Sequence, residues 1–271
     1  MTGRQWRRIG MIGCGAIGSA LAEILAGEAG PGQALTTVLL KPGRDRPKGL
    51  PPTAEVVHDV DSLVHTNPDV VVECAGQAAV RDCALPILEA EIDLVLIATG
   101  ALVDDSLFQD LGDAAERSGA RLHLPAGAIA GIDGLAALRL GGLATVTYSS
   151  TKPPEAWRGT PAEEVVDLAS LREPTVFFTG TAREAARRYP RNANLAATVA
   201  LAGIGFDRTQ IHLIADPRAT GNAGRIEAEG RDGTLDVTFA GRAAVGNPKT
   251  SASTALSLAR TLLNADSAIV I

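Results

Sequence analysis

Aromatic side chains are scarce in this chain, since phenylalanine, tryptophan and tyrosine together make up 3% of its 271 residues. Any core must therefore be built mainly from aliphatic side chains. The chain also lacks the stretch of about 18 uninterrupted apolar residues that a membrane-spanning helix needs. It has no excess of basic charge, because its formal net charge is −6. We therefore expect neither a membrane nor a nucleic acid as partner.

Cysteine is rare as well. The three cysteines, Cys14, Cys74 and Cys83, are odd in number and show no CxxC spacing. This pattern predicts reduced thiols and no metal site. The first residues run directly into a strand-like segment, without the apolar region and cleavage site of a signal peptide. We therefore expect a cytoplasmic protein.

The first part of the chain, residues 1–125, alternates short apolar runs with helix-like stretches. The apolar runs are residues 8–12, 35–40, 70–73 and 94–98, and residues 16–26 have helical spacing. Such alternation predicts a Rossmann-type α/β domain with a doubly wound parallel sheet. Residues 41–52, which are rich in Lys, Arg, Gly and Pro, are expected to form a surface loop.

The pattern of apolar residues changes after residue 125. Residues 126–249 are predicted to form an α+β domain that binds substrate and contributes a dimer contact. Its expected strands lie around residues 175–178, 210–215, 225–228 and 235–240, besides the strand-like TVTYSSTKPP. Residues 250–264 carry leucines at near-helical spacing, which indicates a terminal helix that packs back on the first domain.

A glycine-rich turn joins the first expected strand to the first expected helix. It reads Gly13-Cys14-Gly15-Ala16-Ile17-Gly18. In a dinucleotide site the first glycine makes a tight turn, the second lets the pyrophosphate approach the backbone, and the third lets helix and strand pack closely. We therefore predict that Gly13, Gly15, Ala16, Ile17 and Gly18 bind a nicotinamide dinucleotide.

The end of the second strand usually carries a carboxylate when the cofactor is NAD. This sequence has Leu-Leu-Lys-Pro-Gly-Arg there, with Lys41 and Arg44 available for a 2′-phosphate. An ordinary solvated basic loop is the alternative. The pattern favours NADP over NAD.

Small residues follow the third and fourth strands, where a dinucleotide crosses an open sheet. We expect a cofactor-lining role for six of them, although tight turns would use the same residue types. They are Ala75, Gly76, Gln77, Ala98, Thr99 and Gly100. Ala128 is expected beneath the nicotinamide ring.

Several longer stretches are more particular than the fold requires. They are ECAGQAAVRDCALPILE at 73–89, LIATGAL at 96–102, HLPAGAIAGIDGLAAL at 123–138, TKPPEAWRGTPAE at 151–163, residues 180–217, and NPKTSASTALSL at 247–258. In this order they resemble the L-aspartate dehydrogenase family over nearly the whole chain. The resemblance implies oxidation of L-aspartate to iminosuccinate and then oxaloacetate and ammonia, or the reverse, in a homodimer.

Donors for a small amino dicarboxylate are available in the second part of the chain. Hydroxyls, amides, ammonium groups and helix N-termini all bind carboxylates. The candidates are Lys152, Asn192, Asn194, Thr250 and Ser251. Each also has a plainer interpretation, as a helix cap or a solvated charge.

The sequence departs from the family at one position. After Ala-Asp-Pro the family carries Asn-x-His, whose histidine is taken as the general acid or base, whereas this chain has Gly224 there. Loss of such a group costs about 10²- to 10⁴-fold in rate. The chain could be a natural or introduced knock-out, or act on another amino acid. Alternatively, His212 or His123 could replace the base.

Two hypotheses of different class therefore stand. One is an NAD(P)-dependent amino-acid dehydrogenase or imine reductase, supported by the candidate carboxylate donors. The other is a catalytically impaired or silent dinucleotide-binding protein, supported by Gly224.

Overall fold

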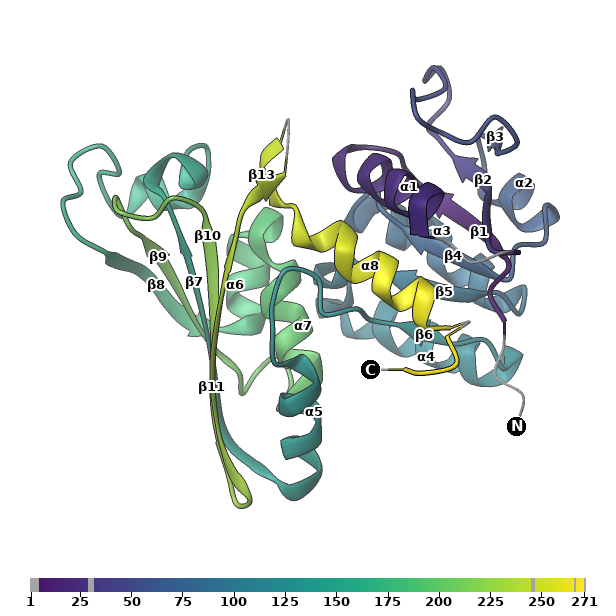
Figure 1. The fold of residues 1–271 in the computed structure, drawn as a ribbon. Coiled ribbons are helices and arrows are strands. Elements are labelled where there is room, and N and C mark those ends of the chain that lie inside the picture. The colour runs from purple at the N-terminus through teal and green to yellow at the C-terminus, as the bar shows by residue number, and fades with distance from the viewer. Residues whose placement is uncertain (1–4, 29–31, 245–246, 266, 271) are drawn as a thin grey trace. The chain divides into compact units, whose positions relative to one another are not determined.

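The computed structural model describes residues 5–28, 32–244, 247–265 and 267–270 (Figure 1). The chain divides into two compact units, Met1–Gly127 with Thr254–Ile271, and Ala128–Ser253. Within the described ranges, no helix has both the length and the apolar character needed to cross a bilayer.

The first unit is built on a six-stranded sheet with the order β3-β2-β1-β4-β5-β6, in which every pairing is parallel. Its strands are β1 (Arg8–Ile12), β2 (Ala34–Leu39), β3 (Glu55–Val57), β4 (Val70–Glu73), β5 (Asp93–Leu96) and β6 (Leu122–His123). Its helices are α1 (Ala16–Glu28), α2 (Val60–His65), α3 (Gln77–Glu89), η1 (Thr99–Val103) and α4 (Asp105–Ser118). The predicted doubly wound parallel sheet is confirmed.

The last helix, α8 (Ser253–Asn264), belongs to the core of the first unit. Its Leu258 and Leu262 are fully buried there, and the side chain of Gln33 donates a hydrogen bond to the Leu262 carbonyl over 2.9 Å. The predicted start of this helix at residue 250 is wrong. Asn247–Ser251 form strand β13 instead, because their backbone pairs with β12 (Ala243–Ala244).

The second unit has a five-stranded mixed sheet with the order β11-β10-β7-β9-β8. Its strands are β7 (Leu143–Lys152), β8 (Thr175–Thr181), β9 (Gln210–Ala215), β10 (Asn222–Gly230) and β11 (Gly233–Gly241). Its helices are α5 (Ile132–Gly141), α6 (Ala182–Arg188) and α7 (Asn194–Ala202), with 3-10 turns η2 (Pro154–Trp157), η3 (Pro161–Glu164) and η4 (Pro190–Asn192). The three α-helices lie along one face of this sheet (Figure 1). The predicted α+β architecture is confirmed.

Alternation along β7 decides which side chains share a face. Tyr148 and Ser150 are buried, and Lys152 follows at the same spacing, whereas Ser149 lies on the other face. In the neighbouring strand β10, Gly224 pairs with Ser150. Gly224, where the resemblance predicts a histidine, is therefore on the same face as Tyr148, Ser150 and Lys152.

No hole is left at Gly224, which is itself buried. A Cβ atom there would lie 2.6 Å from Ile129 Cδ1, 3.0 Å from Tyr148 Cε2 and 3.1 Å from the Tyr148 hydroxyl. Tyr148 and Ile129 thus fill the space into which a side chain at 224 would project. The packing of these two side chains favours glycine here, and the backbone angle of Gly224 is not unusual.

We expect Gly224→Ala to lower the free energy of unfolding by about 1–3 kcal/mol, because an added methyl group overpacks this site. Gly112→Ala is the matched control. Gly112 is an exposed position of α4 with nothing within 4 Å of its added Cβ, so the same change there should raise stability by about 0.5–1 kcal/mol. Urea unfolding of both variants measures the difference. Equal stabilisation at both positions would show that Tyr148 and Ile129 move aside freely.

Candidate functional site

The glycine loop of the first unit has the backbone geometry of a phosphate cradle. Gly13 has φ +79°, and its N–H donates to the Leu39 carbonyl over 2.9 Å. A Cβ at Gly13 would lie 2.7 Å from Ala75 Cβ, and one at Gly18 would lie 2.6 Å from the Gly13 carbonyl oxygen. Both glycines are therefore needed for close approach of backbone segments.

Gly15 differs, because nothing lies within 4 Å of the point where its Cβ would be. Open space thus remains above the turn at the start of α1, whose first residues are Ala16 and Ile17. The first turn of α1 contains no acidic residue, so its free N–H groups and positive dipole end are available to an anion. This loop fits the pyrophosphate of a dinucleotide.

A buried carboxylate holds together the loops that follow β4 and β5. Glu73, which is 1% exposed, accepts hydrogen bonds from the backbone N–H groups of Ala75 (2.6 Å), Gly76 (2.5 Å) and Ala98 (2.9 Å). Three of the predicted cofactor-lining residues are thereby fixed around one side chain. The sequence interpretation overlooked Glu73, although a carboxylate that ends an apolar run was a visible signal.

The other predicted cofactor residues of this unit continue from those loops. Gln77 begins α3, and Thr99 and Gly100 begin η1, with both η1 residues buried. Ala128, by contrast, is the first residue of the second unit. Its predicted place beneath the nicotinamide ring stays a prediction.

The basic loop after β2 is exposed at Lys41 and Arg44. The Arg44 N–H donates to the Lys41 carbonyl over 3.2 Å, which makes a turn that carries both side chains. Arg46 is already engaged, since its guanidinium donates to the carbonyls of Ala54 and Pro51. Lys41 and Arg44 are thus the two cations of this turn that a cofactor phosphate could recruit.

In the second unit, Lys152 and Asn192 meet as expected for neighbours in one site. Lys152 Nζ donates a hydrogen bond to Asn192 Oδ1 over 2.6 Å. Both line a cavity of about 40 Å³. The remaining lining residues are Ala156, Arg158, Gly159, Thr160 and Asn222. Most of these polar groups are donors suited to a carboxylate. Arg158, Thr160 and Asn222 were not predicted as site residues, because Arg158 follows η2, Thr160 precedes η3 and Asn222 begins β10, and only folding brings these elements together.

Lys152 is in an unusual electrostatic environment. Its ammonium lies 4.9 Å from the centre of the buried Trp157 ring. No carboxylate in the described part of the chain forms an ion pair with it, and burial lowers the pKa of Lys152 to about 8. The alternative of an ordinary solvated lysine is therefore wrong.

Asn194 and Ser251, two further predicted substrate residues, are not among the residues that line this cavity. Asn194 is the first residue of α7, and the N-cap is Ala193, so Asn194 is not a cap. Ser251 belongs to β13, where its hydroxyl lies 2.8 Å from that of Ser253 and donates to the Arg242 carbonyl. Thr250 also belongs to β13, but its side chain lies outside the described part of the structure.

Neither histidine candidate shares the face of Gly224. His212 in β9 pairs with Ser149 of β7, which places it on the opposite face from Tyr148 and Lys152. His123 belongs to the first unit and packs edge-on against Trp6, with ring centroids 4.8 Å apart. Burial lowers the pKa of His123, which favours a neutral packed ring. Their proposed role as replacement base gains no support from these positions.

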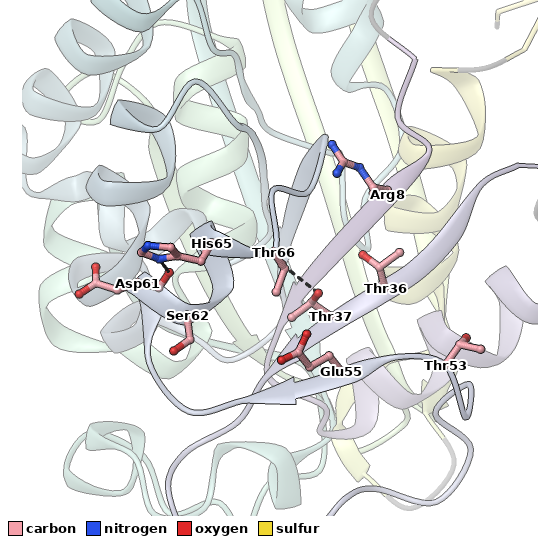
Figure 2. A pocket seen from close by; sticks show the side chains of 9 residues that line it. All are labelled: Arg8, Thr36, Thr37, Thr53, Glu55, Asp61, Ser62, His65 and Thr66. Carbon is pink, nitrogen blue, oxygen red and sulfur yellow. Dashed lines mark hydrogen bonds between the residues drawn. The ribbon is translucent and has the colours of Figure 1, made fainter.

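A larger polar groove of about 680 Å³ lies in the first unit (Figure 2). It is lined by Arg8, Thr36, Thr37, Thr53, Glu55, Asp61, Ser62, His65 and Thr66. Arg8 begins β1, whereas the glycine loop follows the other end of that strand. The groove mixes both signs of charge, and Thr37 donates to Thr66 across it over 2.9 Å. The groove contains no predicted site residue.

Comparison with known proteins gives consistent matches along the chain. Residues 13–125 match the NAD-binding domain family of homoserine dehydrogenase, and residues 133–265 match the C-terminal family of aspartate dehydrogenase. The L-aspartate dehydrogenase of Cupriavidus necator is 44% identical over 269 residues, which cover 97% of this chain and 99% of that protein. The Pseudomonas aeruginosa protein of the same name is 43% identical and covers 96% of this chain and 98% of its own length.

Comparison of the fold with solved structures indicates the same family. The crystal structure of aspartate dehydrogenase from Thermotoga maritima matches with a TM-score of 0.79 at 26% identity, over 97% of this chain and 98% of that one. Sequence and structure agree over nearly the full length of each relative. The chain described here belongs to the aspartate dehydrogenase family.

Proposed function

We propose that this chain catalyses the NAD(P)-dependent oxidation of L-aspartate to iminosuccinate, or the reverse reductive amination. The observation that carries the proposal is the cavity of Lys152, Asn192 and Asn222, which offers an ammonium group without a carboxylate partner in the described residues. A dicarboxylate would supply the missing negative charge. Relatives that match along their whole length are named L-aspartate dehydrogenase.

Each unit has a distinct part in this proposal. The glycine loop and the Glu73-bound loops would hold the dinucleotide, which supplies a hydride acceptor or donor when bound. Arg158 and Asn192 would bind carboxylate oxygens and Lys152 would contact the substrate beside them, with Asn194, Thr250 and Ser251 as further candidates. Orientation of the substrate accounts for much of the rate of a hydride transfer.

We expect L-aspartate to drive reduction of NAD⁺ or NADP⁺ by the purified protein, and oxaloacetate with ammonia to drive the reverse. D-aspartate and uncharged amino acids should react far more slowly, because they misplace or lack the second carboxylate. Steady-state rates from the absorbance of the reduced nicotinamide provide the measurement. A protein that binds the cofactor but responds to no amino or keto acid would be the silent homologue. Turnover of another amino acid would move the proposal to that substrate.

We also infer a preference for NADP, carried by Lys41 and Arg44 on the turn after β2. Charge-assisted contacts to a 2′-phosphate contribute about 1.5–3 kcal/mol each, or roughly tenfold or more in affinity. Replacing both residues by Glu should therefore raise the KM for NADP⁺ at least about tenfold and change the KM for NAD⁺ much less. Lys48→Glu, on the same exposed loop, is the control. An equal loss for both cofactors would contradict the preference.

A homodimer is our proposal for the assembly, as the family resemblance implies. Ser149 and His212 lie on one face of the second sheet, and the other face carries Val146, which packs against Gly203 at the end of α7. We expect light scattering to give twice the mass of one chain, and Ser149→Arg to shift the protein toward monomer. Thr53→Arg, an exposed change in the first unit, should leave the mass unchanged. A monomeric parent protein would rule out the dimer.

We also propose that the protein is located in the cytoplasm. Cys14, Cys74 and Cys83 are all unpaired, and burial raises the pKa of Cys74 and Cys83. Unpaired thiols suit a reducing cytoplasm.

A further inference from the structure

The face of the second sheet that lacks the family histidine carries another nitrogen base. Lys152 lies two positions from Ser150 on β7, and Ser150 pairs with Gly224. Asn222, the asparagine of the family's Asn-x-His unit, lines the same cavity as Lys152. The chemistry lost at position 224 could therefore be supplied from the adjacent strand, beside a residue that the family unit retains.

Other titratable groups near Gly224 do not reach this cavity. Tyr148 is 1% exposed, is absent from the cavity lining, and burial raises its pKa further above the ordinary value of a phenol. His212 faces the opposite side of the sheet. Lys152 is thus the described group on this face that both lines the cavity and can change its charge.

The surroundings of Lys152 leave its ammonium without a compensating charge. Asn192 from η4 accepts its hydrogen bond, and Trp157 of η2 contributes an aromatic ring. Arg158 is the other charged side chain among the described cavity residues. On the side of β9, Asp216 donates its backbone N–H to the Lys152 carbonyl, but its carboxylate accepts from the Arg218 N–H over 2.8 Å.

This environment also fixes the protonation range of the amine. Burial lowers the pKa of Lys152 to about 8, so a substantial neutral fraction exists in mildly alkaline solution. A general base operates best when its pKa lies near the working pH. An ordinary exposed lysine, with a pKa near 10.4, would be almost fully protonated there.

We propose that Lys152 is the general base and acid of the reaction, taking the part that a histidine at position 224 has in the family. This inference rests on the proposed oxidation of aspartate. Asn192 is a positioning residue, because its Oδ1 accepts one N–H of Lys152 and so orients the nitrogen toward the cavity.

The proton and electron balance of the step is complete. Neutral Lys152 Nζ takes one proton from the substrate α-ammonium group, and the electron pair of that N–H bond stays on the substrate nitrogen. The pair then forms the C=N bond as the Cα–H bond breaks and its electrons leave as hydride to the nicotinamide. A bound nicotinamide would supply the two-electron acceptor for this oxidation, and the Lys152 ammonium returns its proton to solvent. Reductive amination reverses each transfer.

Lys152→Arg separates proton transfer from carboxylate binding, because arginine keeps a positive charge but does not lose a proton in this pH range. In the parent protein, kcat/KM for oxidation should rise with pH through a limb near the pKa of Lys152, since the neutral amine is the active form. The variant should lose that limb and lose about 10²- to 10⁴-fold in kcat, with a much smaller change in the KM for aspartate. Lys48→Arg, in the exposed loop, is the matched control and should retain both.

Two further variants test the same assignment in different ways. Lys152→Ala should regain part of its kcat with added primary amines, in an order that follows amine basicity. Asn192→Asp would place a carboxylate beside Nζ, which favours the ammonium form and should move the limb to higher pH by about one unit or more. Dinucleotide binding followed by fluorescence, together with thermal unfolding, verifies that each variant is folded.

The outcomes distinguish this inference from the proposed function. If the parent protein oxidises aspartate and Lys152→Arg keeps both a near-normal kcat and the rise of kcat/KM with pH, the inference alone is overturned. Lys152 would then be a carboxylate anchor. The inference would also be overturned if added amines restored no kcat to Lys152→Ala and if the pH dependence of kcat/KM in Asn192→Asp matched that of the parent protein. A parent protein that oxidises no aspartate with either cofactor would overturn both proposals.

Discussion

The chemistry of the second unit's cavity depends on one ammonium group, that of Lys152, which has no carboxylate partner among the described residues. Burying an ammonium group is unfavourable unless hydrogen bonds or an opposite charge compensate it. Lys152 receives a hydrogen bond partner from Asn192 and an aromatic ring from Trp157, but no carboxylate of the described residues. An anionic substrate would complete its surroundings. Burial lowers the pKa of Lys152 to about 8, and the proposed role of this amine in proton transfer depends on that property.

The buried carboxylate of the first unit, Glu73, differs from Lys152 because it is fully hydrogen-bonded within the protein. Glu73 is almost fully buried, yet its two carboxylate oxygens accept hydrogen bonds from three backbone N–H groups. Its charge is therefore satisfied within the protein, and the gain is rigidity: the loops after β4 and β5 are tied to one side chain. A preorganised loop loses less conformational entropy when a dinucleotide binds. One buried charge thus serves structure, and the other is left available for a ligand.

Gly224 stands where the resemblance predicts a catalytic histidine, and the second sheet is complete around it. Tyr148 and Ile129 occupy the space in front of Gly224, so the sheet packs normally there. Restoring a histidine would require these neighbours to move. The proposed proton-transfer role of Lys152 on the adjacent strand would account for a glycine at this position, because the sheet register keeps both positions on one face.

Local patterns were sufficient to predict much of this protein. Short apolar runs alternating with helical periodicity gave the parallel sheet, and the spacing of Gly13, Gly15 and Gly18 gave the phosphate loop, since both depend on near neighbours in the chain. The start of α8 was misplaced because β13 is held by pairing with β12, which residue order does not reveal.

Long-range contacts decided the rest. The cavity joins Lys152 with Asn192 and Asn222, which lie on separate elements, and the burial that lowers the pKa of Lys152 exists only once those elements have packed. The sheet register likewise placed His212 on the wrong face and Tyr148 against Gly224. The sequence alone therefore determined the fold class and the cofactor loop, because their signals are local. Tertiary structure decided which side chains share a face and which charge is left uncompensated, because those properties arise from contacts between distant residues.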